Sequence, residues 1–175
     1  AESEPGLVSN FVSSIAEGSD GDLWIGTLGG LVHYDPESEQ FTPQYTDDSL
    51  RITGVGCLLF DEAKNLWVGT RTGLYQVGRE RVSKYTNDPN KPGTISGNYV
   101  ISVLQDEKGN LWFGTYGQGL NKLITRGDSV WFETYGTADG LSNNIIFGIQ
   151  QDSHQNLWLS TDYGLSRFNP ASKTA

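Results

Sequence analysis

A short motif built on Leu-Trp recurs four times in this chain at almost constant spacing. Each copy reads Leu-Trp, an apolar residue, Gly or Ser, and Thr, and the copies lie at 23–27, 66–70, 111–115 and 157–161. The motif tryptophans are 43, 45 and 46 residues apart, and they are Trp24, Trp67, Trp112 and Trp158. Units that repeat in this way bury their apolar faces against neighbouring units, so the repeat constrains the fold more than any other feature.

The flanks of each copy predict short antiparallel strands. An apolar segment and a polar turn precede the motif, and the apolar segments lie at 12–16, 55–60, 100–104 and 145–149. A Gly-containing turn follows the motif, and the segments after it alternate apolar and polar residues at 31–34, 74–77, 120–123 and 165–168. Alternation with period two is typical of half-buried strands, and such turns are typical of hairpins.

A fourth, outer strand is expected in three copies, where aromatic residues mark 41–45, 82–85 and 131–135. The fourth copy has no such segment, because only 169–175 follows its third strand. Four strands in this length match one blade of a β-propeller. We therefore predict an all-β propeller array of about fifteen strands and almost no helix, with blades at about 7–46, 50–88, 95–136 and 141–168.

Composition limits the partners. The chain has 12 Lys and Arg against 21 Asp and Glu, and its formal net charge of −9 disfavours nucleic acid and anionic membrane surfaces. No apolar run approaches the ~20 residues that span a bilayer. We therefore expect no nucleic-acid binding and no direct membrane insertion of this segment. Because the first residue is Ala1 rather than Met, we expect a cleaved precursor or a piece of a longer chain.

The motif residues are interpreted as framework rather than chemistry. A tryptophan that recurs at one strand position in every blade is expected to pack between blades. The turn carboxylates Asp61, Asp106 and Asp152 are expected to bond turn amides rather than a metal. In the first copy Gly18 stands at that turn position instead of an aspartate.

The residues that could supply catalysis or bind a metal are few. His33 lies in a third strand and His154 in a turn at the opposite end of its blade, so a shared catalytic site is geometrically awkward. Cys57 lies in an apolar strand, where a buried thiol is the usual outcome. A calcium site at 19–22 would have only two local carboxylates. We therefore expect no catalytic residue, no metal and no cofactor.

Several segments carry a resemblance to a known repeat. Gly-Leu-Ser-Asn-Asn stands at 140–144, and Asn-Leu-Trp-Phe-Gly-Thr at 110–115 is followed by Gly-Leu at 119–120. Over about 6–168 the chain resembles the two-component regulator propeller repeats of bacterial hybrid two-component systems, although Ser160 replaces the strand glycine of the fourth copy. The resemblance implies a periplasmic ligand-sensing module, normally built of many more blades and joined through a membrane helix to a histidine kinase or a diguanylate cyclase.

Blade topology places the candidate ligand site. The innermost strand comes first, so the outer-to-inner connections and the turns between second and third strands meet on one face around the central channel. The candidate ligand-binding residues expected there are Arg71, Tyr116, Gln118, Asp162, Tyr163, Asn98 and Asn144. Tyrosine rings and amides suit a neutral sugar, because a flat ring stacks on Tyr while amides satisfy hydroxyls. At the two asparagines, capping of the turn backbone is the alternative interpretation.

The leading functional hypothesis is a ligand-sensing periplasmic propeller of a hybrid histidine kinase regulator, responding to carbohydrate or oligosaccharide. A second hypothesis is a protein interaction platform that binds another protein or a second copy through the propeller face or exposed edges. A third is an enzyme similar to the streptogramin lyases, whose propeller is a related shape. Because the last blade lacks its outer strand, we also expect a larger ring with further blades, or a homo-oligomer that completes one.

Overall fold

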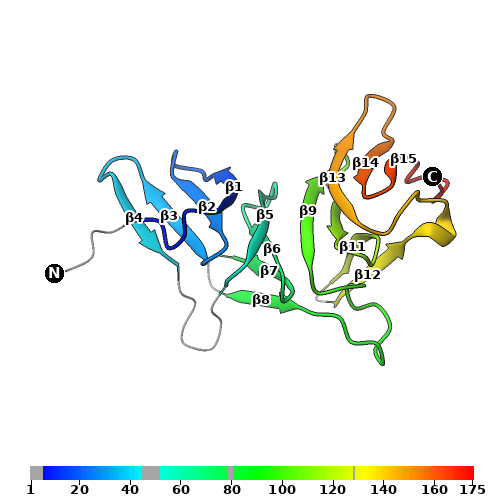
Figure 1. Cartoon of the computed structure of the whole chain (residues 1–175), viewed down its shortest axis with the longest axis horizontal. Coiled ribbons are helices and arrows are strands. Elements are labelled where there is room, and N and C mark those ends of the chain that lie inside the picture. The colour runs from blue at the N-terminus through cyan, green and yellow to red at the C-terminus, as the bar shows by residue number, and fades with distance from the viewer. Residues whose placement is uncertain (1–5, 45–51, 79–80, 128) are drawn as a thin grey trace.

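The computed structural model describes residues 6–44, 52–78, 81–127 and 129–175, and its strands form four separate antiparallel sheets (Figure 1). Blade 1 contains β1 (Val12–Glu17), β2 (Leu23–Thr27), β3 (Leu31–Asp35) and β4 (Gln40–Pro43), and blade 2 contains β5 (Val55–Phe60), β6 (Leu66–Thr70), β7 (Leu74–Val77) and β8 (Val82–Tyr85). Blade 3 contains β9 (Val100–Gln105), β10 (Leu111–Thr115), β11 (Leu120–Arg126) and β12 (Ser129–Tyr135), and blade 4 contains β13 (Ile146–Gln151), β14 (Leu157–Thr161) and β15 (Gly164–Phe168).

The predicted all-β class is confirmed. Fifteen strands form over the described ranges, and the one helical element there is the short 3-10 helix η1 (Thr137–Asp139). The expected outer strand at 41–45 is β4, although Tyr45 lies outside the described residues. Blade 4 has three strands in the described structure, and the tail after β15 folds back so that the Ala175 amide donates to the Asp139 carbonyl at 3.0 Å.

The blades stack face to face in chain order. The first strands β1, β5, β9 and β13 contact one another in that sequence, and one hydrophobic cluster fills each of the three junctions between blades. Figure 1 shows the order as a progression from the blue blade 1 at one end to the orange and red blade 4 at the other. The core is therefore divided into layers between sheets, as expected for repeats that bury their faces on each other.

Each blade has two different faces. Its trailing face carries the motif tryptophan, and its leading face carries the two apolar residues that flank that tryptophan in the second strand. Trp67 on the trailing face of blade 2 packs against Phe113 on the leading face of blade 3, with ring centroids 5.3 Å apart. Trp112 meets Phe168 of blade 4 in the same way at 5.9 Å. Both tryptophans are fully buried, because alternate strand positions point to opposite faces and every inner face is covered.

A hydrogen bond ties each motif tryptophan to the hairpin turn that precedes it. In blade 3, Asp106 accepts from the Trp112 indole Nε1 at 2.9 Å and from the Asn110 backbone amide at 2.9 Å. The Asn110 side-chain amide also donates to both carboxylate oxygens. Asp61 with Trp67 and Asp152 with Trp158 repeat the arrangement. The bonds to turn amides were predicted from the sequence, whereas the indole as a further donor was not.

These donors favour the ionised carboxylates. The Trp158 indole, followed by the Asn156 side chain and backbone, lowers the pKa of Asp152 from 3.8 to about 2. Burial alone would raise the pKa of Asp106, but the bonds from Trp112 and Asn110 outweigh it, so this pKa is also lowered. The turns are therefore held together best when the aspartates carry their charge.

We predict that Trp112→Ala destabilises the chain by about 3–5 kcal/mol, because the side chain fills a closed junction between two blades. Trp158→Ala is the matched control, since it removes the same motif residue and the same indole bond from a side chain that is 37% exposed. Its loss should be less than half as large. Urea denaturation of both variants at low protein concentration measures the difference, and equal losses would contradict the layered core.

The lowered pKa of Asp152 predicts a specific acid sensitivity. Because the folded pKa of about 2 lies below the ordinary 3.8, the ionised group stabilises the fold above 3.8, and this contribution is lost as the pH falls toward 2. Asp152→Asn removes the titration. The melting temperature of the parent chain should fall more steeply over this window than that of the variant, and parallel curves would show that the turn bonds do not favour the charge.

Candidate functional site

The candidate ligand site is a cavity at the face where the first strands of the four blades meet. Its volume is about 230 Å³. The residues that line it come from all four blades: Phe11, Ser13, Leu28, Gly54, Val55, Gly56, Arg71, Tyr99, Ile101, Tyr116 and Phe147. Turns and strand ends from separate repeats therefore combine into one surface, which is the face where the sequence placed the ligand site.

Three side chains form a stack at the centre of this cavity. The rings of Tyr99 and Tyr116 lie 5.2 Å apart at an interplanar angle of 26°, and the Arg71 guanidinium lies 5.5 Å from the Tyr99 ring centroid. The two tyrosines meet because Tyr99 precedes β9 and Tyr116 follows β10, its antiparallel partner. The Tyr116 amide also donates to the Tyr99 carbonyl at 2.8 Å.

Gly54 of blade 2 lies against the arginine. The Arg71 amide donates to the Gly54 carbonyl at 3.2 Å, and a Cβ at Gly54 would lie 3.4 Å from the aliphatic part of the Arg71 side chain. Gly54 also has a φ of +63°, a conformation that side chains rarely adopt. The backbone of blade 2 therefore positions the arginine against the tyrosine of blade 3.

The cavity combines exposed aromatic rings with one charge. Tyr116 is 51% exposed, and two further lining residues, Phe11 and Phe147, are 66% and 50% exposed. Arg71 is the one charged residue in the lining, and no carboxylate of the described residues lies within 4.0 Å of its guanidinium. Such a surface can stack against a flat ring and can donate several hydrogen bonds from the guanidinium.

Of the seven predicted site residues, the structure brings Arg71 and Tyr116 together. Gln118 is exposed beside the cavity, where its amide donates to Thr115 Oγ1 at 3.1 Å. Asp162 and Tyr163 lie in the exposed turn between β14 and β15, with Tyr163 79% exposed. These three do not line the cavity, and their part in ligand binding stays a prediction.

The two asparagines bond backbone amides. Asn98 Oδ1 accepts from the Asn87 amide at 2.7 Å, and Asn144 Oδ1 accepts from the Thr137 amide at 2.9 Å. Each therefore connects the start of its blade to the linker that comes from the preceding blade. This geometry is that of the capping interpretation, and it leaves ligand binding by these two residues as a prediction.

Tyr99 and Phe147 are cavity residues that the sequence reasoning missed. Tyr99 directly precedes a predicted first strand, and an aromatic residue beside a turn on the channel face was the signal available for it. Phe147 lies in a β-bulge, where the pairing with β14 shifts register between Ile146 and Gly148. A bulge interrupts the period of two, so the sequence pattern does not show where this side chain points.

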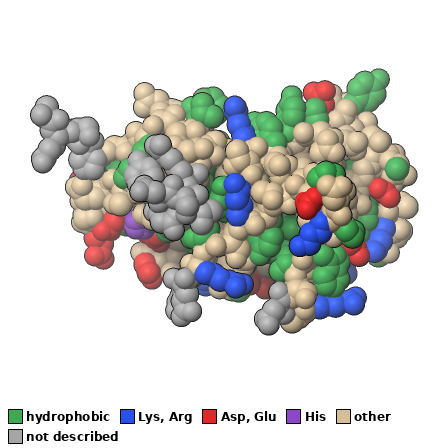
Figure 2. Space-filling view, turned by 90° about the horizontal axis from the view of Figure 1, so that it is seen from below, with side chains coloured by type: hydrophobic (Ala, Val, Ile, Leu, Met, Phe, Trp, Pro, Cys, Tyr) green, Lys and Arg blue, Asp and Glu red, His purple; other side chains and the backbone are tan. Residues whose placement is uncertain are grey.

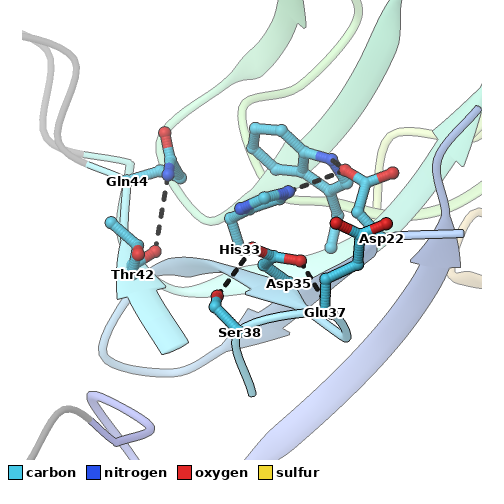
Figure 3. Close-up of polar contacts among 8 residues, drawn as sticks. Asp22, His33, Asp35, Glu37, Ser38, Thr42 and Gln44 are labelled. Carbon is cyan, nitrogen blue, oxygen red and sulfur yellow. Dashed lines mark hydrogen bonds and ion pairs between the residues drawn. The ribbon is translucent and has the colours of Figure 1, made fainter. Parts of the chain in front are cut away.

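Blade 1 preserves the carboxylate–indole bond with a different residue (Figure 3). Asp22 Oδ2 accepts from the Trp24 indole Nε1 at 2.9 Å and lies 2.7 Å from His33 Nε2. A Cβ at Gly18 would overlap the Asp22 carboxylate, so this carboxylate fills the place that the missing turn aspartate would occupy. Asp22 thus replaces, from the other side of the turn, the aspartates of blades 2–4.

The remaining candidates for chemistry are separated from one another. His33 lies in β3 of blade 1, and His154 lies in the blade 4 turn with its amide bonded to Asp152. Figure 2 shows acidic side chains gathered at the blade 1 end of the face that it draws. Cys57 is buried, and burial raises the pKa of its thiol to about 12. In the described ranges no three potential metal ligands cluster, and no helix there has the length and apolar character to cross a bilayer.

Four blades of this topology define the chain as a β-propeller array. The sequence model of the family described as "Two component regulator propeller" matches residues 6–29, 94–117 and 140–163, which include the Leu-Trp motifs of the first, third and fourth copies. Three segments of the chain therefore match two-component regulator propeller repeats, and the resemblance seen in the sequence is confirmed.

The chain is similar to parts of longer proteins. It is 29% identical to Histidine kinase P4 of Formosa agariphila, over 86% of this chain and 12% of that protein. The crystal structure of the extracellular domain of the putative hybrid two component system BT3049 from B. thetaiotaomicron matches 94% of this chain and 22% of that one, with a TM-score of 0.77 and 23% identity. Virginiamycin B lyase from Staphylococcus aureus matches 93% of this chain and 58% of the lyase, with a TM-score of 0.59 and 18% identity. At these sequence identities, the similarity to the two solved structures shows that this chain shares their fold.

We predict that Asp22→Ala destabilises blade 1 by about 1 kcal/mol, because the partly buried Trp24 indole loses its acceptor. The double variant Gly18→Asp with Asp22→Ala should recover most of this loss, since it returns the carboxylate to the turn position used in the other blades. Denaturant midpoints of the two variants and the parent measure the rescue. A double variant less stable than the single one would show that blade 1 requires its own arrangement.

Proposed function

We propose that this chain is part of the periplasmic ligand-sensing propeller of a bacterial hybrid two-component regulator. The observation that carries the proposal is the match of three segments to two-component regulator propeller repeats. Similarity to a histidine kinase, and to a structure described as the extracellular domain of a putative hybrid two component system, supports it. Any kinase activity would then reside outside these 175 residues, and the propeller would contribute recognition.

The ligand that suits the cavity best is a carbohydrate. A sugar ring can lie on an exposed tyrosine face, and Tyr116, which stacks on Tyr99, presents one in the cavity that Arg71 also lines. The cavity, at about 230 Å³, is smaller than the ~300–1,000 Å³ of typical pockets for drug-sized ligands. It therefore suits about one sugar ring, and a longer oligosaccharide would extend over the exposed rings of Phe11 or Phe147.

An enzyme is the weaker alternative. The likeness to virginiamycin B lyase is one of fold, and the two histidines of this chain lie in blades 1 and 4 rather than in one site. A general base must come within hydrogen-bond reach of the proton that it removes. We therefore expect binding without turnover of glycans or lactones. A turnover that His33→Ala or His154→Ala abolishes would favour the enzyme.

The binding proposal is tested by screening a glycan array with the whole chain and then titrating the strongest hit by calorimetry. Tyr116→Ala and Arg71→Ala should each weaken that binding about tenfold or more. The first removes the aromatic face that would stack on the sugar ring, and the second removes the guanidinium that would donate hydrogen bonds to it. Both side chains are exposed, so the melting temperature should change little.

Tyr163→Ala tests whether recognition extends beyond the cavity, since Tyr163 is a predicted ligand residue that is more exposed than Tyr116 and lies outside the cavity lining. If the cavity alone recognises the ligand, the affinity of this variant should equal that of the parent chain. Equal weakening by Tyr163→Ala and Tyr116→Ala would place recognition on the wider turn surface, and binding unaffected by all three changes would reject the site.

A further inference from the structure

The side chains that line the cavity are rich in hydrogen-bond donors and poor in acceptors. None of the described lining residues is an acid or an amide, and the polar ones are Ser13, Arg71, Tyr99 and Tyr116. Ser13 Oγ donates to the Val55 carbonyl at 2.6 Å, so this hydroxyl is engaged within the fold. A guanidinium has several N–H donors and no acceptor. Arg71 therefore dominates the polar chemistry of the lining.

This lining differs from the surface that suits a neutral sugar. A sugar hydroxyl both donates and accepts, and side-chain amides match it because they do both. Asn98 and Asn144 instead bond backbone amides of the linkers between blades, and Gln118 lies beside the cavity. A carboxylate accepts at two oxygens and donates nothing, so it complements a guanidinium better than a hydroxyl does.

The fold does not require an arginine at position 71. In blades 1–3 the residue after the motif threonine donates its backbone amide to the residue that precedes the first strand. The pairs are Leu28 with Phe11 at 3.0 Å, Arg71 with Gly54 at 3.2 Å, and Tyr116 with Tyr99 at 2.8 Å. The equivalent residue of blade 4 is Asp162. Because the bond uses the backbone, four different side chains occupy this position, and that of Arg71 is available for recognition.

The aromatic stack holds the guanidinium in the cavity. Arg71 reaches from blade 2 to blade 3, where its guanidinium lies 5.5 Å from the Tyr99 ring centroid, and Tyr99 in turn stacks on Tyr116. The planar guanidinium is also preorganised, so it loses less conformational freedom for each hydrogen bond that it forms with a ligand. Blade 2 has a described blade on each side, so this arrangement does not depend on the ends of the chain.

We propose that the ligand of this cavity is an acidic saccharide, whose carboxylate binds the Arg71 guanidinium while a sugar ring lies on Tyr116. This inference rests on the proposed sugar-binding function and names the class of sugar. Hydrogen bonds between a guanidinium and a carboxylate are about twice as strong as those between neutral groups. The formal net charge of −9 repels anions from the chain as a whole, so the preference depends on the local charge of Arg71.

Paired oligosaccharides test the preference. Oligosaccharides of galacturonate and glucuronate are compared with the same molecules after each carboxylate has been reduced to a hydroxymethyl group, which removes the charge and keeps the ring. In calorimetric titrations of the whole chain, the best acidic ligand should bind about tenfold or more tightly than its reduced form. Added salt should weaken the acidic ligand and leave the neutral one unchanged, because it screens the charge.

Arg71→Gln should abolish the difference between the two members of a pair, because the lost affinity belongs to the carboxylate contact. Arg71→Lys keeps the charge without the planar fork, so it should retain part of the preference. Arg126→Gln is the matched control. Arg126 is also exposed and lies 5.1 Å from the Trp131 ring centroid, but it is outside the cavity lining. Its replacement changes the net charge equally and should leave the preference intact.

The outcomes separate this inference from the proposed function. Equal binding of acidic and reduced ligands, weakened alike by Tyr116→Ala, would overturn the acidic class and leave the sugar site in place. A preference that Arg71→Gln and Arg126→Gln reduce equally would also overturn it, since net charge rather than the cavity would then be responsible. If no oligosaccharide binds, acidic or neutral, both the inference and the proposed function are rejected.

Discussion

The hydrogen bond between a turn carboxylate and the motif indole is the interaction on which each blade depends. It joins the first hairpin to the second strand and fixes the tryptophan ring at the angle that the next blade packs against. In blade 1 the carboxylate–indole bond is kept although the aspartate stands at a different sequence position, because Asp22 supplies the carboxylate that Gly18 lacks. The blade therefore requires the bond and not an aspartate at one fixed position. A buried indole N–H without an acceptor would cost about 1–3 kcal/mol, which is more than the net stabilisation of about 0.5–1.5 kcal/mol from a typical hydrogen bond.

From this local unit the array follows by packing. Every blade presents a tryptophan face to its successor and a face of smaller apolar residues to its predecessor, so the contacts between blades have a direction. The same stacking brings the ends of strands from four repeats to one place. Arg71 of blade 2 meets the two tyrosines of blade 3 there, although these residues are far apart in the sequence. The framework therefore creates the cavity, while the residues that differ between blades give it its chemistry.

Much of the fold could be predicted from the sequence because its signals are local and repeated. The Leu-Trp motif, its turns and the period of two predicted the fifteen strands of the described residues, of which three form the sheet of blade 4. The candidate site was predictable in part. Topology indicated the face on which the cavity lies and two residues of its lining, Arg71 and Tyr116, whereas Gln118 and Asp162 lie outside that lining.

The sequence by itself determined the repeat and the order of the strands within each blade, because these depend on residues within one hairpin of each other. Only the tertiary structure decided which side chains meet across blades. Two features depend on the tertiary structure and cannot be read from the linear pattern. One is the bulge that places Phe147 in the cavity lining, and the other is the carboxylate of Asp22, which takes the place of the aspartate that is missing at Gly18. Leu120 follows a glycine in its strand as Leu165 does, and its complete burial was decided by the blade that packs against it.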